Sequence, residues 1–383
     1  MFRTCIVCQS SDSEKIYRNN LAILDNLDLS YTVSCCSNCG AAYASELQNE
    51  KTLNTYYERY SKYDIYESKE HVPKLYNEIS KVTVSVIKES GIQPEKVFDI
   101  GSSFGTFLND MQIEFKCEVK GIDPAPNARV NAKKVYGIEV ETGFYKGNKY
   151  LAAYNIVSAN SVLEHIVDVQ QFMLDISRYS RDKSYLVITV PSADAFARTN
   201  CEWLGEFSNE HINFFSKKSL NDLMSLHHYN NIFSAESEMS NGQYVLVSIF
   251  RKDSGLASRG LEPYRKTILS LRKYLENSNE SLQKIYSLLD SVKNEEYVIW
   301  GAGSHTQKLL NLKYFKDRPP KLIIDSNLVF SKSTLNNIRI VHPDRIADFN
   351  VYPSVLISSY NAQNSINNAL ISTGYRGNII KTY

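Results

Sequence analysis

The sequence predicts an α/β protein in three parts, with a doubly wound, mostly parallel sheet at its centre. Between residues 71 and 226, short apolar segments typical of strands alternate with segments of helical periodicity, and such alternation indicates a parallel sheet covered by helices. In addition, two apolar segments, at 97–100 and 297–300, run directly into glycine turns followed by helix-forming sequence. At 383 residues, the chain is long enough for two or three domains with separate cores.

The central sheet follows a helix that we expect from His71 to about Glu89, where apolar residues recur at near-helical spacing. Ligands of doubly wound sheets bind at the carboxyl ends of the strands, so glycine and polar residues at that edge are candidate binding residues. The strands are expected at 97–100, 119–122, 138–140, 156–159 and 185–190.

Residues 97–108, VFDIGSSFGTFL, predict a loop that binds a nucleotide cofactor. Asp123 ends the next strand about twenty residues further on, where a carboxylate can bind a ribose hydroxyl. Dinucleotides and S-adenosylmethionine (SAM) both fit that arrangement. However, Gly101 and Gly105 are four residues apart, whereas a dinucleotide fingerprint needs tight glycines to admit a pyrophosphate. With a third strand that ends at Asn160, this order favours a SAM-dependent methyltransferase.

SAM is therefore expected along Gly101 to Gly105, with its ribose on Asp123 and its adenine near Phe144 and Tyr145. The residues expected to bind SAM are Gly101, Ser102, Gly105, Asp123, Pro124, Phe144, Asn160 and Glu164.

Five of the seven cysteines fall in the first 39 residues. Cys5 and Cys8 form one C-x-x-C pair, Cys36 and Cys39 form another, and four thiolates at this spacing predict a tetrahedral Zn²⁺ site. A closed shell of four cysteines leaves no position for substrate, so we expect a structural zinc. Cys35 does not have the two-residue spacing to Cys39 and is therefore not expected to be a zinc ligand. A redox pair is the alternative, disfavoured because two matched pairs occur together.

The composition of the chain limits the kinds of partner that it is expected to bind. Lys and Arg total 43 against 42 Asp and Glu, so the net charge of +1 gives no field to attract nucleic acid. No apolar stretch approaches the ~20 residues that span a bilayer, and the first residues lack a signal-peptide core. We therefore expect a cytoplasmic protein that binds neither nucleic acid nor membranes, as a monomer or a homodimer.

A polar and aromatic loop at 200–216 contains the strongest candidate base. Imidazole titrates near neutral pH, so His211, beside Glu210, can take a proton from a hydroxyl or an acidic carbon. A histidine that only packs the loop over the cofactor is the equal alternative.

Tyrosines at helical offsets between 56 and 66 form one face, which we interpret mainly as a seam between domains. Tyr63 and Tyr66 are kept as candidate substrate-binding residues.

The carboxyl-terminal part begins with a long helical arm at 264–292, followed by strands at 297–300 and 321–325. The third glycine of the dinucleotide fingerprint is replaced by Thr306, which favours a degenerate Rossmann-like domain that holds part of the substrate. Ser304 and His305 are candidates to contact a diphosphate, although helix capping explains Ser304 equally well. The expected domains are 1–66, which binds zinc, 67–255, the methyltransferase, and 256–383, the arm with the Rossmann-like domain.

Taken together, the chain resembles, over nearly its full length, the sugar C-methyltransferases that act on nucleotide-linked deoxy-keto-sugars. The resemblance implies a nucleotide-sugar substrate, a role in deoxysugar or polysaccharide biosynthesis, and a catalytic pair at Glu210 and His211. The motifs that carry the resemblance are 99–108 (DIGSSFGTFL), 121–128 (GIDPAPNA), 160–168 (NSVLEHIVD) and 209–216 (NEHINFFS).

For a keto-sugar, His211 is expected to remove the proton α to the ketone, after which the enolate carbon attacks the methyl group of SAM. Glu210 is expected to orient the imidazole and stabilise its charged form. The main alternative is a sugar O-methyltransferase of surface polysaccharide or natural-product biosynthesis. Two others are a zinc-dependent scaffold without turnover and an NAD oxidoreductase that uses Gly301 to Gly303.

Overall fold

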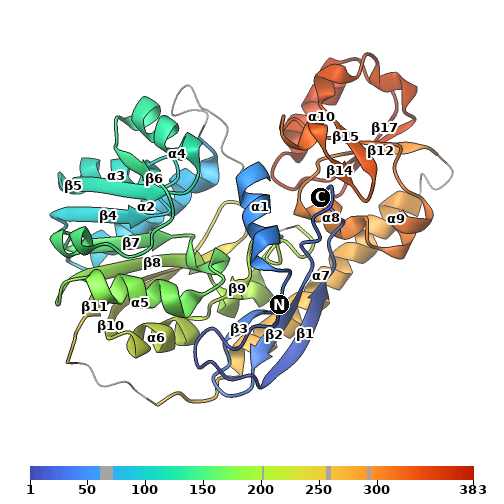
Figure 1. Cartoon of the computed structure of the whole chain (residues 1–383). Coiled ribbons are helices and arrows are strands. Elements are labelled where there is room, and N and C mark those ends of the chain that lie inside the picture. Colours follow the sequence, from blue (N-terminus) through green and yellow to red (C-terminus); the bar gives the residue numbers. More distant parts are fainter. Residues whose placement is uncertain (61–71, 201, 256–259, 291–294) are drawn as a thin grey trace.

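The computed structural model describes residues 1–60, 72–200, 202–255, 260–290 and 295–383, and within these ranges the strands form three sheets (Figure 1). A seven-stranded sheet occupies the middle of the chain, a four-stranded sheet contains the amino-terminal strands, and a six-stranded sheet lies near the carboxyl terminus. No helix within these ranges is long and apolar enough to cross a bilayer. The mixed α/β fold with mostly parallel sheets confirms the predicted fold class.

The central sheet has the strand order β10-β11-β8-β7-β4-β5-β6. The five strands from β8 to β6 are parallel, and β11 and β10 add an antiparallel hairpin at one edge, which the sequence did not predict. Its strands are β4 (Lys96–Ile100), β5 (Glu118–Asp123), β6 (Val140–Thr142), β7 (Ile156–Asn160), β8 (Tyr185–Pro191), β10 (Tyr229–Glu238) and β11 (Tyr244–Lys252).

The strand predicted at 138–140 begins later than expected. The backbone N–H of Ile138 still bonds to the oxygen of Ala132, 3.2 Å away, so this residue completes the preceding helical turn, and β6 starts at Val140.

Helices cover both faces of the central sheet, so its strands are buried on both sides. Along β4, the side chain of Val97 packs in one apolar cluster with α2 and α3, whereas Phe98 packs in another with α5 and α6. This alternation is the period-two pattern of a strand with two buried faces. The helices are α2 (Lys74–Glu89), α3 (Thr106–Phe115), α4 (Pro126–Asn131), α5 (Val169–Tyr179) and α6 (Lys217–Leu226). Short helical turns are η2 (Ala132–Tyr136), η3 (Lys149–Ala153), η4 (Leu163–His165) and η5 (Ala193–Arg198).

The amino-terminal sheet contains β1 (Ser13–Asn19), β2 (Tyr31–Cys36) and β3 (Ala42–Glu46), all antiparallel. Its fourth strand, β9 (Asn213–Phe214), comes from the loop after η5 and pairs with β3. One apolar cluster accordingly includes residues of this sheet, of the loop before β9 and of the carboxyl-terminal part. This cluster thus includes residues of all three predicted domain ranges. The boundary predicted at residue 66 lies outside the described residues, and the three ranges stay predictions.

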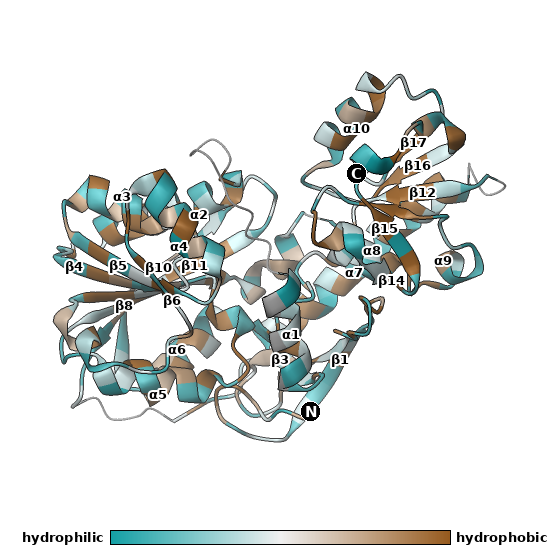
Figure 2. Cartoon of the chain, turned by 45° about the horizontal axis from the view of Figure 1, so that its top comes forward, coloured by the Kyte–Doolittle hydropathy of each residue, from teal (hydrophilic) through white to brown (hydrophobic). Residues whose placement is uncertain are grey.

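The carboxyl-terminal sheet has the order β14-β15-β13-β12-β16-β17, parallel except for β14 with β15, and Figure 2 shows its hydrophobic strands. The predicted arm is the helix α7 (Lys266–Asp290), which packs against η5 and β1. The strands are β12 (Tyr297–Trp300), β13 (Ile323–Ile324), β14 (Thr334–Leu335), β15 (Ile338–Val341), β16 (Ser354–Ile357) and β17 (Asn378–Lys381). The helices and turns are α1 (Glu50–Tyr60), which follows β3, and α8 (Ser304–Leu309), α9 (Lys313–Asp317), α10 (Gln363–Ser372), η6 (Phe330–Lys332), η7 (Pro343–Arg345) and η8 (Phe349–Val351).

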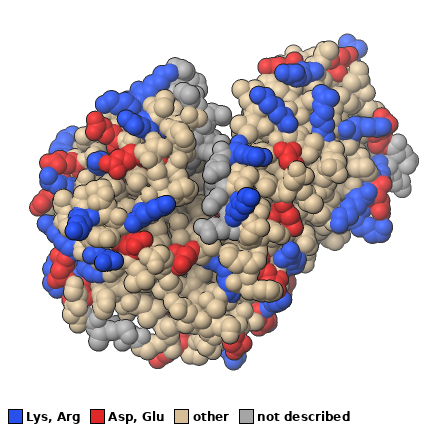
Figure 3. Space-filling model, in the orientation of Figure 1, with Lys and Arg blue, Asp and Glu red and all other residues tan. Residues whose placement is uncertain are grey.

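Charged side chains of both signs are interspersed on the face of the molecule seen in Figure 3. This distribution matches the near-zero net charge of the sequence.

The guanidinium group of Arg3 joins the amino-terminal sheet to the loops of the central domain. It donates hydrogen bonds to the backbone oxygens of Ala44 (3.0 Å), Ile212 (3.2 Å) and Val167 (2.9 Å), and to Oδ1 of Asn213 (2.7 Å). Burial lowers the pKa of Arg3 to about 10, so the group stays charged at neutral pH. Arg3 thus fixes the turn after β7 and the segment before β9 against β3.

Replacing Arg3→Met should lower the free energy of unfolding by roughly 2–5 kcal/mol, because several buried oxygens lose their donor. Chemical denaturation measures the change. Arg18→Met is the matched control: its side chain is 43% exposed and bonds to Thr32, so a loss below about 0.5 kcal/mol is expected. Equal losses in the two variants would contradict the role given to Arg3.

Candidate active site

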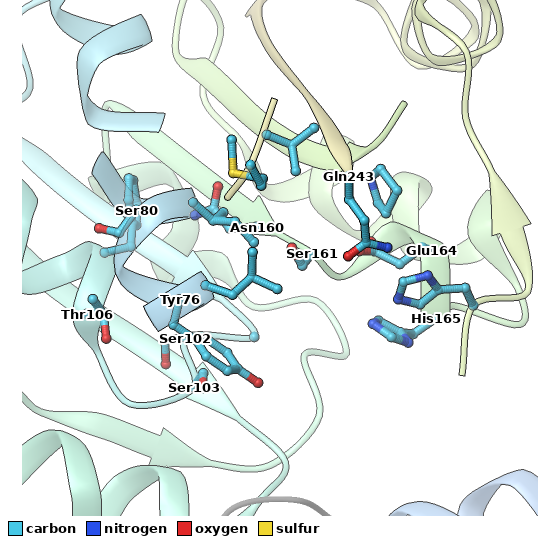
Figure 4. A pocket seen from close by; sticks show the side chains of 18 of the residues that line it. Tyr76, Ser80, Ser102, Ser103, Thr106, Asn160, Ser161, Glu164, His165 and Gln243 are labelled. Atoms are coloured by element: carbon cyan, nitrogen blue, oxygen red, sulfur yellow. The ribbon is translucent and has the colours of Figure 1, made fainter. Parts of the chain in front are cut away.

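A cavity of about 320 Å³ opens at the carboxyl edge of the central sheet. Its walls come from α2, from the loop after β4, from the ends of β7 and β8, from the segment before β9 and from the turn between β10 and β11. In Figure 4, Ser102, Ser103 and Thr106 lie on one side of this pocket, and Glu164, His165 and Gln243 lie on the other. The pocket therefore joins the predicted cofactor loop to the predicted catalytic segment.

The loop after β4 turns through backbone conformations that favour glycine. Gly101 and Gly105 have φ of 75° and 78°. A Cβ on Gly101 would lie 2.4 Å from Cγ2 of Val162, so the loop also packs too closely against the η4 segment for a side chain there. Ser103 and Ser161 line the pocket with φ of 48° and 53°, a conformation that costs energy for residues other than glycine.

The carboxylate of Asp123 binds the backbone of this loop. Its Oδ2 accepts a hydrogen bond from the backbone N–H of Ser103 (2.8 Å), and its Oδ1 accepts one from Ala125 (2.9 Å). Burial raises the pKa of Asp123 to about 6. The carboxylate thus ties the end of β5 to the glycine loop, and each oxygen keeps a lone pair for a further donor.

Asp99, in β4, is a pocket residue that the sequence analysis did not single out as a site residue. Its Oδ1 accepts hydrogen bonds from Ser158 Oγ (2.7 Å) and Asn160 Nδ2 (3.2 Å). Burial, assisted by the charge of Asp123, raises the pKa of Asp99 to about 7. The available signal was its place two residues before Gly101, at the edge where ligands bind.

Glu210 and His211 reach the pocket from the segment before β9. Glu210 Oε1 accepts a hydrogen bond from the hydroxyl of Tyr56 (2.8 Å), a buried residue of α1, and that hydroxyl accepts one from Asn209 Nδ2 (2.9 Å). The sequence had placed Tyr56 in a domain seam, so its contact with the predicted catalytic pair was not foreseen. The amino-terminal part of the chain thus positions a carboxylate of the pocket.

His211 packs against a second imidazole. The ring centroids of His211 and His165 are 5.0 Å apart, nearly at right angles. Nδ1 of His165 lies 3.0 Å from the backbone oxygen of Glu210, to which it donates when protonated there. One nitrogen or oxygen from each of Glu164, His165 and His211 lies within 4.8 Å of the others.

Residues 70–232 match a family model described as a methyltransferase domain. This part of the chain is a methyltransferase domain. Its match begins at α2 and ends in β10, so it includes the glycine loop, the pocket and the segment with Glu210 and His211. The protein is therefore an enzyme, as predicted.

The solved structures that resemble the central domain include two methyltransferases. A 1,6-didemethyltoxoflavin-N1-methyltransferase from Burkholderia thailandensis, solved with 1,6-didemethyltoxoflavin and S-adenosylhomocysteine, is 14% identical, with a TM-score of 0.41 over 56% of this chain and 96% of its own. A SAM-dependent methyltransferase from Methanosarcina mazei is 13% identical, with a TM-score of 0.36 over 44% of this chain and 96% of its own. At these values neither structure adds to the assignment, and no curated protein matched the chain.

Of the residues predicted to bind SAM, those that line the pocket are Gly101, Ser102, Asn160 and Glu164. Gly105 is the N-cap residue that precedes α3, and Asp123 accepts a hydrogen bond from the backbone of the loop at Ser103. Pro124 is exposed, and Phe144, at 63% exposure, lies outside the pocket lining. The contacts of all eight residues with the cofactor stay predictions.

Three buried polar atoms of the methyltransferase pocket have no hydrogen-bond partner in the described part of the chain: Ser102 Oγ, Ser103 Oγ and Glu164 Oε2. Buried polar groups are normally paired, because an unpaired one costs about 1–3 kcal/mol. Their gathering at one pocket fits a polar ligand such as SAM.

Of the residues predicted to bind substrate outside the central domain, Ser304 and His305 belong to the described part of the chain, and neither lines the pocket. Tyr63 and Tyr66 lie outside the described residues. His305 is buried, and its ring nitrogens are bonded to Ser358 Oγ and to the hydroxyl of Tyr383, each at 2.8 Å. Burial lowers the pKa of His305 to about 3, so the ring is neutral and has no nitrogen left for a diphosphate. The described structure thus gives no support for a diphosphate contact of His305, and the roles of His305 and Ser304 stay predictions.

The predicted zinc ligands Cys5, Cys8, Cys36 and Cys39 come together, with all four sulfurs within 4.8 Å of one another. Sγ of Cys5 is 3.5 Å from that of Cys39, and Cys8 is 3.4 Å from Cys36. Tetrahedral zinc with bonds of about 2.3 Å places its sulfurs roughly 3.8 Å apart, so the cluster fits the ion. Cys35 lies outside the cluster, with its sulfur 3.4 Å from the backbone oxygen of Gly40.

Replacing Gly101→Ala should weaken SAM binding at least roughly tenfold, because a Cβ displaces Val162 and shifts the loop. Calorimetric titration with SAM measures this. Gly91→Ala is the control, since Gly91 has a similar φ of 74° but nothing within 4 Å of its Cβ. Both variants should lose about 1–2 kcal/mol of stability, while only Gly101→Ala loses affinity. Unchanged affinity in Gly101→Ala would show that SAM binds elsewhere.

Proposed function

We propose that the protein transfers the methyl group of SAM to a carbon of a nucleotide-linked deoxy-keto-sugar. The observation that carries the proposal is that His211 and Glu210 line the same pocket as the glycine loop. A candidate base beside the cofactor loop is what methylation of an acidic carbon requires. The resemblance of the sequence motifs to sugar C-methyltransferases supports the choice of a keto-sugar.

Within this proposal, SAM is held by the loop from Gly101 to Gly105. The hydroxyls of Ser102 and Ser103 are buried donors without a partner among the described residues, and Asp99 is a buried carboxylate at the same wall. When bound, SAM supplies an electrophilic methyl group for attack by the substrate carbon. Asp99 suits its positively charged end, since a nearby cation favours the ionised carboxylate.

His211 takes the proton from the carbon next to the ketone. The C–H bond breaks, the proton goes to the imidazole, and the electron pair moves onto the carbonyl oxygen as an enolate. Glu210 stabilises the imidazolium by its negative charge, and Tyr56 keeps that carboxylate in place at 2.8 Å. Held in attack geometry, the reactants gain up to about 7–11 kcal/mol over free encounter.

The cluster of Cys5, Cys8, Cys36 and Cys39 supports a structural zinc ion in this proposal. A cluster of four thiolates leaves no open coordination position, so the ion stabilises the amino-terminal part of the chain and takes no part in the reaction.

Replacing His211→Asn should lower both methyl transfer and deuterium exchange by about 100-fold or more, since both need the base. Exchange at the carbon next to the ketone is followed by NMR, without SAM, over a panel of nucleotide-linked keto-sugars. SAM affinity should be unchanged. His228→Asn, at an exposed histidine outside the pocket, is the control and should behave like the wild type. Transfer without any exchange in the wild type would instead indicate O-methylation.

Purified protein should contain one zinc ion per chain by atomic emission. Cys8→Ser should lose the ion and unfold at a markedly lower temperature, because the metal's binding energy stabilises the fold. Cys35→Ser should keep the ion, as its sulfur is outside the cluster. Loss of zinc in both variants, or in neither, would contradict the proposed ligand set.

A further inference from the structure

Glu164 is the most deeply buried carboxyl group of the pocket. The residue is 1% exposed, compared with 2% for Asp99, and its Oε2 lacks a hydrogen-bond partner in the described part of the chain. It lies in η4, directly after β7, and lines the same pocket as His211. A buried carboxyl oxygen with no partner, facing a pocket, indicates a group that bonds to a ligand.

Six other titratable side chains line the pocket with Glu164. His165 and His211 each have a ring nitrogen within 4.8 Å of a carboxyl oxygen of Glu164. The other four are Tyr76, Asp99, Glu210 and Tyr244. Burial raises the pKa of Glu164 to about 8, and the opposing effect comes from its own backbone amide. At neutral pH the group is therefore mainly a neutral carboxylic acid, which can donate a hydrogen bond as well as accept one.

The fold places Glu164 accurately relative to His211. The backbone oxygen of Glu164 accepts a hydrogen bond from the N–H of Ile212 (2.8 Å), the residue after His211. Nδ2 of Asn213 donates to the oxygens of Leu163 (2.7 Å) and Ile166 (2.8 Å), on either side of Glu164. These hydrogen bonds hold the η4 segment against the segment that contains His211, as a preorganised site requires.

We propose that Glu164 is a catalytic residue that donates a hydrogen bond to the carbonyl oxygen of the acceptor while His211 removes the neighbouring proton. This role rests on the proposed function and deepens it, because it makes the acceptor a ketone. Negative charge develops on the carbonyl oxygen as the C–H bond breaks, and a neutral acid stabilises it without bringing a like charge. Glu164 keeps its proton throughout. The carbonyl re-forms as the enolate carbon bonds to the methyl group, while the bond from that methyl group to the sulfur of SAM breaks and S-adenosylhomocysteine leaves.

Because Glu164 must be protonated to donate, its ionisation should limit activity on the alkaline side. Exchange and transfer should decline as pH rises through about 8, where the acid loses its proton. A hydroxyl acceptor develops no enolate, so for O-methylation a neutral Glu164 would have no such task.

The matched variants are Glu164→Gln, which keeps a hydrogen-bond donor at similar volume, and Glu164→Leu, which removes it. In the full-length protein, Glu164→Gln should keep exchange and transfer within about tenfold of wild type and lose the alkaline decline. Glu164→Leu should lose about 100- to 1000-fold in both rates. Circular dichroism spectra and unfolding midpoints close to those of the wild type should show that both variants fold. Because Glu164 is also a predicted SAM-binding residue, SAM affinity is measured by calorimetry and the rates are compared at saturating SAM.

Infrared difference spectra test the protonation state without any substrate. The wild type minus Glu164→Gln should show the C=O stretch of a protonated carboxyl group at neutral pH, and this band should vanish as pH rises through about 8. Absence of the band at neutral pH overturns the inference and leaves the proposed function untouched.

Two kinetic outcomes overturn the inference by other routes. If Glu164→Gln is as inactive as Glu164→Leu while wild type exchanges deuterium, the ionised carboxylate is required instead, as a base or a metal ligand. Titration with Mn²⁺ followed by electron paramagnetic resonance then identifies a cation on Glu164, His165 and His211. If the wild type catalyses no deuterium exchange on any keto-sugar, the proposed function is wrong. The inference that Glu164 donates to a carbonyl oxygen is then wrong as well.

Discussion

The pairing of β9 with β3 is the constraint on which the pocket depends. β9 is two residues long and begins two residues after His211, so its hydrogen bonds to β3 fix where the imidazole lies. Arg3 strengthens the same junction by bonding backbone oxygens on both sides of it. The glycine loop after β4 in one sheet and His211 beside the edge strand of another therefore line one pocket, in a geometry that neither sheet sets alone.

Burial raises the pKa values of two carboxyl groups in the pocket. Asp99 and Glu164 have pKa values raised to about 7 and about 8, yet their surroundings differ. Asp99 accepts two side-chain hydrogen bonds, which favour the ionised form, whereas Oε2 of Glu164 has no partner within the described ranges. Two carboxyl groups in one cavity can thus serve opposite ends of a reaction, one next to positive charge and one next to developing negative charge.

Local patterns predicted much of this architecture. The central strands, the glycine loop and the two C-x-x-C pairs were recoverable because each depends on residues close together in sequence. The contact of Tyr56 with Glu210 spans 154 residues, and no local pattern encodes it. The partners of His305 were not foreseen for the same reason, since Ser358 and Tyr383 reach its ring only in the folded chain. Asp99 was missed although its motif was recognised, because its burial depends on strands on both sides of β4.

The origin of β9 has a consequence for synthesis. β3 ends at Glu46, but the strand that covers its edge is Asn213–Phe214, which the ribosome adds 167 residues later. At roughly 5–20 residues per second, that interval lasts about 8 to 33 seconds. During this time the nascent chain carries an unpaired strand edge, the kind of surface that recruits chaperones or pairs with a neighbouring chain. Fast closure of this sheet therefore matters most at high expression, when nascent chains are crowded.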